Sequence, residues 1–158
     1  MKKEFFDHMH TVMESNPDVY FLMLGLGWPR LDEFLAKYPG RAFNLEASEQ
    51  SGLDVAVGLA YAGKIPVIYT ITPFYLRAFE TIRTYLNHEC LHVIIIGAGR
   101  DDDYSKHDGY SHEAGDIGRI LATQENIQQY YPNTVEQLKQ MVHVAVENTS
   151  PAFISIRR

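Results

Sequence analysis

The feature that most constrains the fold is a regular alternation between short apolar runs, rich in β-branched residues, and amphipathic segments with helical periodicity. Neighbouring parallel strands need crossover connections, which are usually helices and are right-handed. The run at residues 91–96 is apolar on both faces, as expected for a central strand covered by helices on either side. The pattern predicts an α/β fold: a doubly wound, mostly parallel sheet of about six strands with helices on both faces.

The expected elements follow one another without a linker, so we expect one domain over residues 1–158. Strands are expected at residues 19–24, 41–45, 65–71, 91–96, 127–130 and 152–156, and helices before Asn16, after Pro29, at 48–62, 73–88 and 113–122, and after Thr134. The first helix carries the apolar stripe Phe5, Phe6, Met9, Val12 and Met13, and Thr134 with Gln137 forms a capping box. The polar loop at residues 97–111 exceeds the usual length of roughly 2 to 6 residues, which indicates a functional element.

Charge and composition exclude several classes of function. Lys and Arg total 14 against 20 for Asp and Glu, a formal net charge of −6, which argues against a nucleic acid partner. No run approaches the roughly 20 apolar residues of a membrane span, and the N-terminal residues lack the apolar core of a secretory signal. We therefore expect a cytoplasmic protein that contacts neither nucleic acid nor membrane. The single cysteine, Cys90, is expected to be a small buried hydrophobe and not a nucleophile.

Familiar short motifs are incomplete in this chain. The pairs Gly25/Gly27 and Gly97/Gly99 lack the third glycine of a dinucleotide fingerprint, and neither a phosphate-binding P-loop nor a nucleophile elbow occurs. The histidines suggest two metal sites, His107 with Asp108 and His112, or His88 with His92, but neither has the ligand set of a zinc site, so we predict no metal. The run at residues 101–103 is expected to be a solvated acidic loop.

One group of side chains is more informative. In parallel α/β sheets ligands bind outside the carboxyl ends of the strands, and Glu46 and Glu49 lie where an expected strand meets the next helix. An acidic residue there also stabilises the helix dipole, which is the simpler explanation. However, Phe74 and Arg77 open the following helical segment away from its apolar stripe. A carboxylate, an aromatic ring and a guanidinium are therefore expected to converge on this edge.

These residues belong to four blocks that resemble a known family. Residues 46–60 resemble the motif of the pyrimidine-binding domain of transketolases and of 1-deoxyxylulose-5-phosphate synthase, in which an acidic residue precedes Gln and a helix of small residues. Three further blocks are similar in order and spacing: Gly63-Lys-Ile-Pro66-Val, Thr72-Pro-Phe74-Tyr-Leu-Arg77 and Asp108-Gly-Tyr-Ser-His112-Glu. Together they span residues 41–158, about three quarters of the chain.

The resemblance implies thiamine diphosphate chemistry and assigns roles to individual residues. Glu49 would be the catalytic carboxyl that hydrogen-bonds N1′ of the aminopyrimidine. Phe74 would stack on that ring, and Arg77 would complete the cofactor-binding set by orienting groups near it. Asp108 and His112 would bind substrate, and His112, the second predicted catalytic residue, would move protons at a ketose hydroxyl.

The resemblance also implies a partner. The family binds the diphosphate and Mg²⁺ through a separate domain with a Gly-Asp-Gly motif and a downstream Asn, and neither occurs in this sequence. A separate diphosphate-binding transketolase subunit would then hold both, with a homodimer of pyrimidine domains inside a heterotetramer. Ser111, Glu113 and Ile71 depart from the family pattern, as does the loop at 99–107, so the sugar substrate is open.

Two alternatives remain open at this point. The chain could be a subunit of a thiamine-dependent 2-oxo acid decarboxylase or dehydrogenase, which uses the same glutamate. It could also be a non-catalytic pseudo-subunit, although a silent domain has no need of a desolvated carboxyl. The leading hypothesis is the pyrimidine-binding subunit of a two-chain, thiamine-dependent transketolase-like enzyme that transfers a two-carbon ketol unit between sugars.

Overall fold

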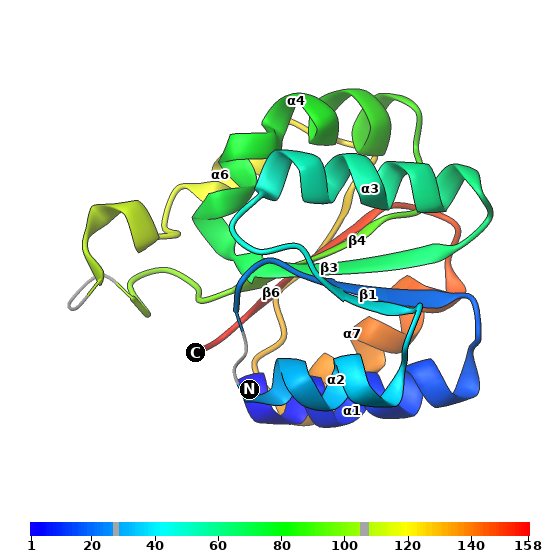
Figure 1. Cartoon of the computed structure of the whole chain (residues 1–158). Coiled ribbons are helices and arrows are strands. Elements are labelled where there is room, and N and C mark those ends of the chain that lie inside the picture. Colours follow the sequence, from blue (N-terminus) through cyan, green and yellow to red (C-terminus); the bar gives the residue numbers. More distant parts are fainter. Residues whose placement is uncertain (27–28, 105–107) are drawn as a thin grey trace.

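A computed structural model describes residues 1–26, 29–104 and 108–158, and its centre is a six-stranded sheet (Figure 1). The strands are β1 (Val19–Met23), β2 (Ala42–Asn44), β3 (Ile65–Ile71), β4 (Ile94–Ala98), β5 (Gln128–Tyr130) and β6 (Ala152–Ile156). Their order is β2-β1-β3-β4-β6-β5, and every neighbouring pair is parallel. The predicted sheet is therefore confirmed.

Helices cover both faces of the sheet, as the doubly wound prediction requires (Figure 1). One layer holds α1 (Lys2–Ser15), α2 (Arg30–Lys37) and α7 (Val135–Glu147). The other holds α3 (Glu49–Tyr61), a helical stretch made of η1 (Thr72–Ala78), α4 (Phe79–Thr81) and η2 (Ile82–His88), and α6 (Ile117–Leu121). A short turn of 3₁₀ helix, η3 (Tyr110–His112), lies in the long loop after β4.

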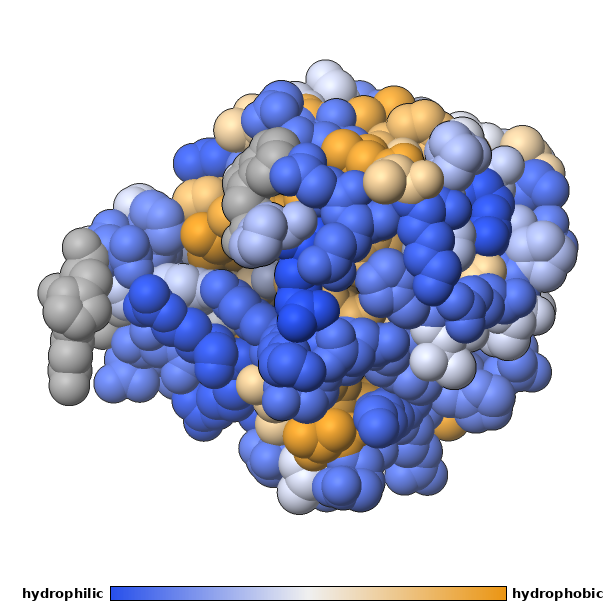
Figure 2. All heavy atoms as spheres, turned by 60° about the horizontal axis from the view of Figure 1, so that its bottom comes forward, coloured by the Kyte–Doolittle hydropathy of each residue, from blue (hydrophilic) through white to orange (hydrophobic). Residues whose placement is uncertain are grey.

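Two hydrophobic cores lie on opposite faces of the sheet, because successive side chains of a strand alternate between faces. Phe21 of β1 packs in the core under α1, α2 and α7, whereas its neighbour Leu22 packs in the core under α3 and η2. All five residues of the stripe predicted for the first helix are buried. The surface turned forward in Figure 2 is largely hydrophilic, with apolar residues gathered in separate patches.

The expected helix at 73–88 is present, but its hydrogen bonding is irregular. It begins as 3₁₀ helix in η1 and ends as π helix in η2. The buried Tyr75 hydroxyl lies 2.7 Å from the carbonyl oxygen of Ile68 and 3.0 Å from that of Ile96. Burial raises the pKa of this phenol well above its ordinary value, so it stays a neutral donor. This tether fixes the first turns against β3 and β4.

Other boundaries differ from those expected for local reasons. The strand expected from residue 91 begins at Ile94, and the helix expected from 113 begins at Ile117 because Glu113 leaves helical geometry with ψ of 135°. The prediction that Cys90 is buried is wrong: it is exposed, in the turn before β4, with a left-handed φ of 55°.

Among the described residues, none of the helices combines the length and apolar character that a membrane crossing requires.

The predicted cap of α7 is confirmed in part. The Thr134 hydroxyl accepts the backbone N–H of Gln137 at 3.2 Å. The side-chain oxygen of Gln137 returns to the backbone N–H of Asn133 at 2.8 Å, one residue before the position a standard capping box uses.

Candidate functional site

The topological switch point of the sheet lies beside β1. The chain runs from β1 to β2 on one side of β1, and then returns to place β3 on its other side. Ligands of doubly wound sheets bind in the crevice outside the carboxyl ends of the strands at such a point. The segments that follow β2, β3 and β4 at this edge carry Glu49, Phe74 with Arg77, and His112, respectively.

Glu49 is the first residue of α3, and its side chain is only 4% exposed. The chain reaches this position through a tight turn in which Glu46 adopts a φ of 52°. The helix packs closely on the sheet at Gly52, where a Cβ atom would lie 2.6 Å from a methyl carbon of Leu24. A carboxylate at a helix N-terminus is stabilised by the helix dipole, which offsets part of the cost of burying it.

Arg77 links the Glu49 carboxylate to the Phe74 ring. Arg77 Nη1 lies 2.6 Å from Glu49 Oε1, and the guanidinium carbon lies 4.2 Å above the centre of the Phe74 ring. The Arg77 side chain is 54% exposed, so this ion pair covers the buried carboxylate from the solvent side. The corner formed by Glu49 and Phe74 therefore accommodates a flat, cationic N–H donor lying on an aromatic face.

His112 belongs to the same group. Its ring lies 5.0 Å from the Phe74 ring in an edge-to-face arrangement with an interplanar angle of 66°. Its Nδ1 lies 3.0 Å from the Ser111 hydroxyl, and its ring centre lies 6.4 Å from that of Tyr104. The structure thus brings together Glu49, Phe74, Arg77 and His112, as the sequence predicts, although their chemical roles remain predictions.

Asp108 lies apart from this group. Its carboxylate pairs with Arg158, at 3.6 Å from Nη1 to Oδ2, and its predicted role in binding substrate remains a prediction. His107, the third member of the first considered metal site, lies outside the described residues. Of the second, His92 contacts the Ala145 carbonyl oxygen at 2.8 Å and His88 faces Glu89.

The residues that the structure describes contain no cluster of three or more His, Cys, Asp or Glu side chains able to hold a metal ion.

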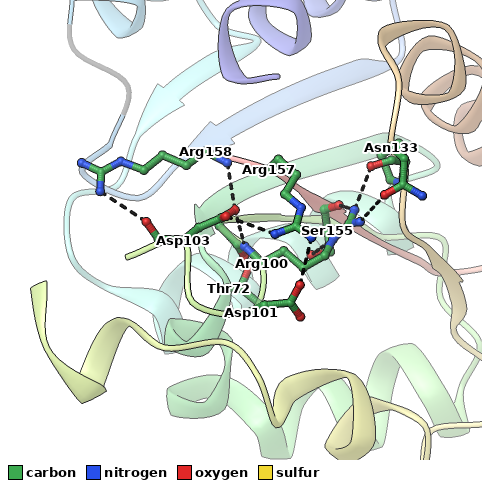
Figure 3. Close-up of polar contacts among 10 residues, drawn as sticks. Thr72, Arg100, Asp101, Asp103, Asn133, Ser155, Arg157 and Arg158 are labelled. Atoms are coloured by element: carbon green, nitrogen blue, oxygen red, sulfur yellow. Dashed lines mark hydrogen bonds and ion pairs between the residues drawn. The ribbon is translucent and has the colours of Figure 1, made fainter. Parts of the chain in front are cut away.

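A network of ion pairs at the ends of β4 and β6 was not predicted from the sequence (Figure 3). The acidic run at 101–103 was expected to be solvated, which is wrong for Asp103: its side chain is 16% exposed and bonds to Arg157. Arg157 also pairs with Asp101 at 3.0 Å. The available signal was a run of aspartates in a long loop together with two arginines after the last strand, but nothing in the sequence pairs them.

A cavity of about 120 Å³ lies beside this network. Arg100, Asp101, Tyr131 and Ser155 line it, together with Thr72 at the start of η1. The Arg100 guanidinium is held by neutral oxygens, donating to Asn133 Oδ1 at 3.0 Å and to the Pro132 carbonyl at 2.9 Å (Figure 3). Burial, followed by the charge of Arg157, lowers the pKa of Arg100 from its ordinary value. Arg100 thus connects β4, β6 and the segment before α7.

Comparison with known proteins gives matches over nearly the whole chain. The family described as "Transketolase, pyrimidine binding domain" matches residues 3–158. One of the subunits of the apulose-4-phosphate transketolase of Actinobacillus succinogenes is 27% identical over 80% of this chain and 41% of its own length. A 1-deoxy-D-xylulose-5-phosphate synthase of Geobacter sulfurreducens is 28% identical over 81% of this chain and 20% of its own length. The chain therefore spans less than half of either relative.

A solved structure of a split gene transketolase, described as an inactive beta4 tetramer, has the same fold. It superposes with a TM-score of 0.85 and 27% identity, over 99% of this chain and 50% of the solved one. The match extends through every strand and helix described above, including the segments that carry Glu49, Phe74, Arg77 and His112.

Proposed function

Because this chain belongs to the transketolase pyrimidine-binding domain family, we propose that it forms the aminopyrimidine half of a thiamine diphosphate site in a two-chain, transketolase-like enzyme. Its reaction is the transfer of a two-carbon ketol unit between sugars. The catalytic residues are Glu49 and His112, and the cofactor-binding residues are Glu49, Phe74 and Arg77.

The observation that carries the proposal is the contact of Arg77 with Glu49 and Phe74. The planar guanidinium of Arg77 lies 4.2 Å above the centre of the Phe74 ring, and one of its N–H groups donates to the buried Glu49 carboxylate at 2.6 Å. An aminopyrimidine is also planar, and its N1′ nitrogen, when protonated, is an N–H donor that needs an acceptor and an aromatic face in the same places. We propose that the guanidinium occupies the position between Glu49 and Phe74 in the free chain and moves to the edge of the pyrimidine ring when the cofactor binds.

The chain's own residues have distinct tasks in this proposal. Thiamine diphosphate, when bound, supplies the nucleophilic carbon for carbon–carbon cleavage and formation. Glu49 would hold a proton between its Oε atom and N1′, and its burial, with 4% of the side chain exposed, would exclude competing water. Phe74 orients the ring by stacking. His112, at the rim of Phe74, gives or takes a proton at a substrate hydroxyl.

The diphosphate, Mg²⁺ and the second half of the site belong, in this proposal, to a separate diphosphate-binding subunit. The Actinobacillus relative is one subunit of a transketolase, and the solved structure is a split gene transketolase in a beta4 tetramer. Both support a divided enzyme, and the tetramer supports more than one copy of this chain in the assembly. We propose a homodimer of pyrimidine domains within a heterotetramer. We propose a ketose as the substrate class; the relative is named for apulose 4-phosphate.

The test compares two matched glutamates in the complex with the diphosphate-binding subunit. Glu49→Gln removes the buried charge, whereas Glu46→Gln makes the same change three residues earlier, at an exposed carboxylate that accepts from Asn44 Nδ2. Loss of a proton-transfer group costs roughly 10²- to 10⁴-fold in rate. We expect that loss in ketol transfer for Glu49→Gln, with near-normal turnover for Glu46→Gln. Equal turnover by the two variants would refute the proposal.

A further inference from the structure

We propose that Asp103 is a positioning residue: its carboxylate clasps the loop after β4 to the end of β6, and thereby sets the place of His112 over Phe74. The importance of this placement for ketol transfer rests on the proposed function, whereas the clasp itself does not. Neither the family resemblance nor the sequence pattern assigns a role to this residue, because the loop around it is unlike the usual family loop.

The clasp consists of three hydrogen bonds to one carboxylate (Figure 3). Asp103 Oδ2 accepts the backbone N–H of Arg100 at 2.9 Å and that of Arg158 at 3.0 Å. Its Oδ1 accepts Arg157 Nη1 at 3.2 Å. Two of the donors, Arg157 and Arg158, follow β6, more than fifty residues away in the chain. One side chain therefore extends the connection between the ends of β4 and β6 beyond their last strand pair, Ala98 with Ile156.

The bonds persist at neutral pH because the carboxylate stays charged. Burial alone would raise the pKa of Asp103, but the N–H groups of Arg100 and Arg158 and the Arg157 guanidinium hold that pKa below its ordinary value. Charge-assisted bonds of this kind are about twice as strong as neutral ones.

The clasp is connected to His112 through Tyr104. The Tyr104 ring packs directly on Gly99, where a Cβ atom would overlap it, and the Arg158 guanidinium lies 4.7 Å above it. The same ring lies 6.4 Å from that of His112. Farther along, the Tyr104 carbonyl accepts the N–H of Asp108 at 3.1 Å. The Tyr104 ring is buried, and Lys2 Nζ also lies 5.0 Å from its centre, so releasing Asp103 would shift this ring rather than free it, and the shift would reach His112 beside it.

The other end of the loop closes on itself. The carbonyl of Asp101 accepts the N–H of Ala114 at 3.0 Å, and the carbonyl of Gly109 accepts that of His112 at the same distance. Both ends of the segment that bears His112 thus lead back to the residues that flank Asp103. The geometry of this segment depends on how residues 100–103 are anchored, because the backbone bonding of β4 to β6 ends with the bond from the Gly99 N–H to the Ile156 carbonyl at 2.8 Å.

The experiment uses Asp103→Asn in the chain of residues 1–158, with Asp101→Asn as the matched control. Asp101 shares the partner Arg157 at 3.0 Å, but its side chain is 59% exposed, and exposed ion pairs contribute little. The first readout is the NMR signal of the His112 ring in the isolated chain, which is shifted by the nearby Phe74 ring. The second is kcat and the Kd for thiamine diphosphate in the complex with the partner subunit.

We expect Asp103→Asn to move the His112 signals toward those of a free imidazole and to lower kcat by about 10- to 100-fold, since small misplacements of reacting groups have such effects. The Kd should change less than about 2-fold, because Glu49 and Phe74 are untouched. Asp101→Asn should match the wild type. If Asp103→Asn does not fold, Arg157→Gln, which leaves both backbone bonds to Asp103, should give a smaller displacement of the same signals.

Unchanged His112 signals in Asp103→Asn would overturn the inference, as would equal effects of the two aspartate variants. Failure of the proposed function has a different signature. In that case the wild-type mixture shows no ketol transfer, while the displacement of the His112 signals in the isolated Asp103→Asn chain is still observed.

Discussion

Removing Arg77 should destabilise the chain, and removing Glu49 as well should restore part of the loss. In Arg77→Met the Glu49 carboxylate, 4% exposed, is left without its guanidinium. Two unit charges about 4 Å apart near a protein surface attract by about 4 kcal/mol, and breaking a fully buried pair costs about 3 to 5 kcal/mol. Because Arg77 is 54% exposed, water screens the pair, so we expect a loss of about 1 to 3 kcal/mol in the free energy of unfolding.

The reverse change should cost less. In Glu49→Gln the amide still accepts a hydrogen bond, and the guanidinium that loses its carboxylate can turn toward solvent. We expect a loss of about 1 kcal/mol or less. The double variant Glu49→Gln/Arg77→Met contains no buried charge at this place, so it should be more stable than Arg77→Met alone by about 1 kcal/mol.

Urea unfolding followed by circular dichroism measures all four proteins of this double-mutant cycle. For a chain of this size, 1 kcal/mol corresponds to about 2 to 4 °C in Tm, which gives an independent thermal check. An Arg77→Met variant as stable as the wild type, or a double variant less stable than Arg77→Met, would refute the prediction, because either result means that Glu49 does not depend on Arg77 for its charge.

Three further predictions concern other parts of the chain. In the same urea titration, Gly99→Ala should lose about 2 kcal/mol or more of stability, because Gly99 has a φ of 85° and a Cβ atom would overlap the Tyr104 ring. Gly58→Ala in α3 is the control: it has open space around it and should gain up to about 1 kcal/mol. Burial, followed by the charge of Lys37, lowers the pKa of His10, so the unfolded chain takes up this proton at a higher pH than the folded chain does. The free energy of unfolding should therefore decrease as the pH falls below about 6.5, and it should decrease less steeply in His10→Gln. His112→Ala should reduce ketol transfer in the assembled enzyme while leaving the Kd for thiamine diphosphate within about 2-fold, and an equal loss of both would assign the histidine a structural role.

The strands that the sequence predicts to the residue are those whose limits are local. The strand at Ile65–Ile71 is a β-branched run between the Gly63 turn and Pro73, and the last strand follows Pro151. The expected start at residue 91 is wrong because the apolar run begins in the connection: the Val93 N–H bonds to the Leu91 carbonyl at 2.8 Å, and this local turn leaves no trace in composition. The contacts of η1 are tertiary, since its Tyr75 hydroxyl bonds to the carbonyl oxygens of Ile68 and Ile96, and the sequence does not reveal them.

Some features of the site could be predicted from the sequence, and others could not. Glu49, Phe74 and His112 could be grouped in advance because each follows the carboxyl end of a strand, and in a parallel sheet those ends share one edge. The bond between Arg77 and Glu49 could not, since two residues at one edge need not touch. The bonds of Asp103 were less accessible still, because its partners come from the far end of the chain.

The most direct test is the structure of this chain assembled with its diphosphate-binding subunit and thiamine diphosphate. We predict a pyrimidine nitrogen within about 2.6 to 3.2 Å of a Glu49 carboxylate oxygen, the ring stacked on Phe74, and the Arg77 guanidinium displaced from that face. A structure in which Arg77 still bonds to Glu49 across Phe74, while the pyrimidine ring lies elsewhere, would contradict the proposed site.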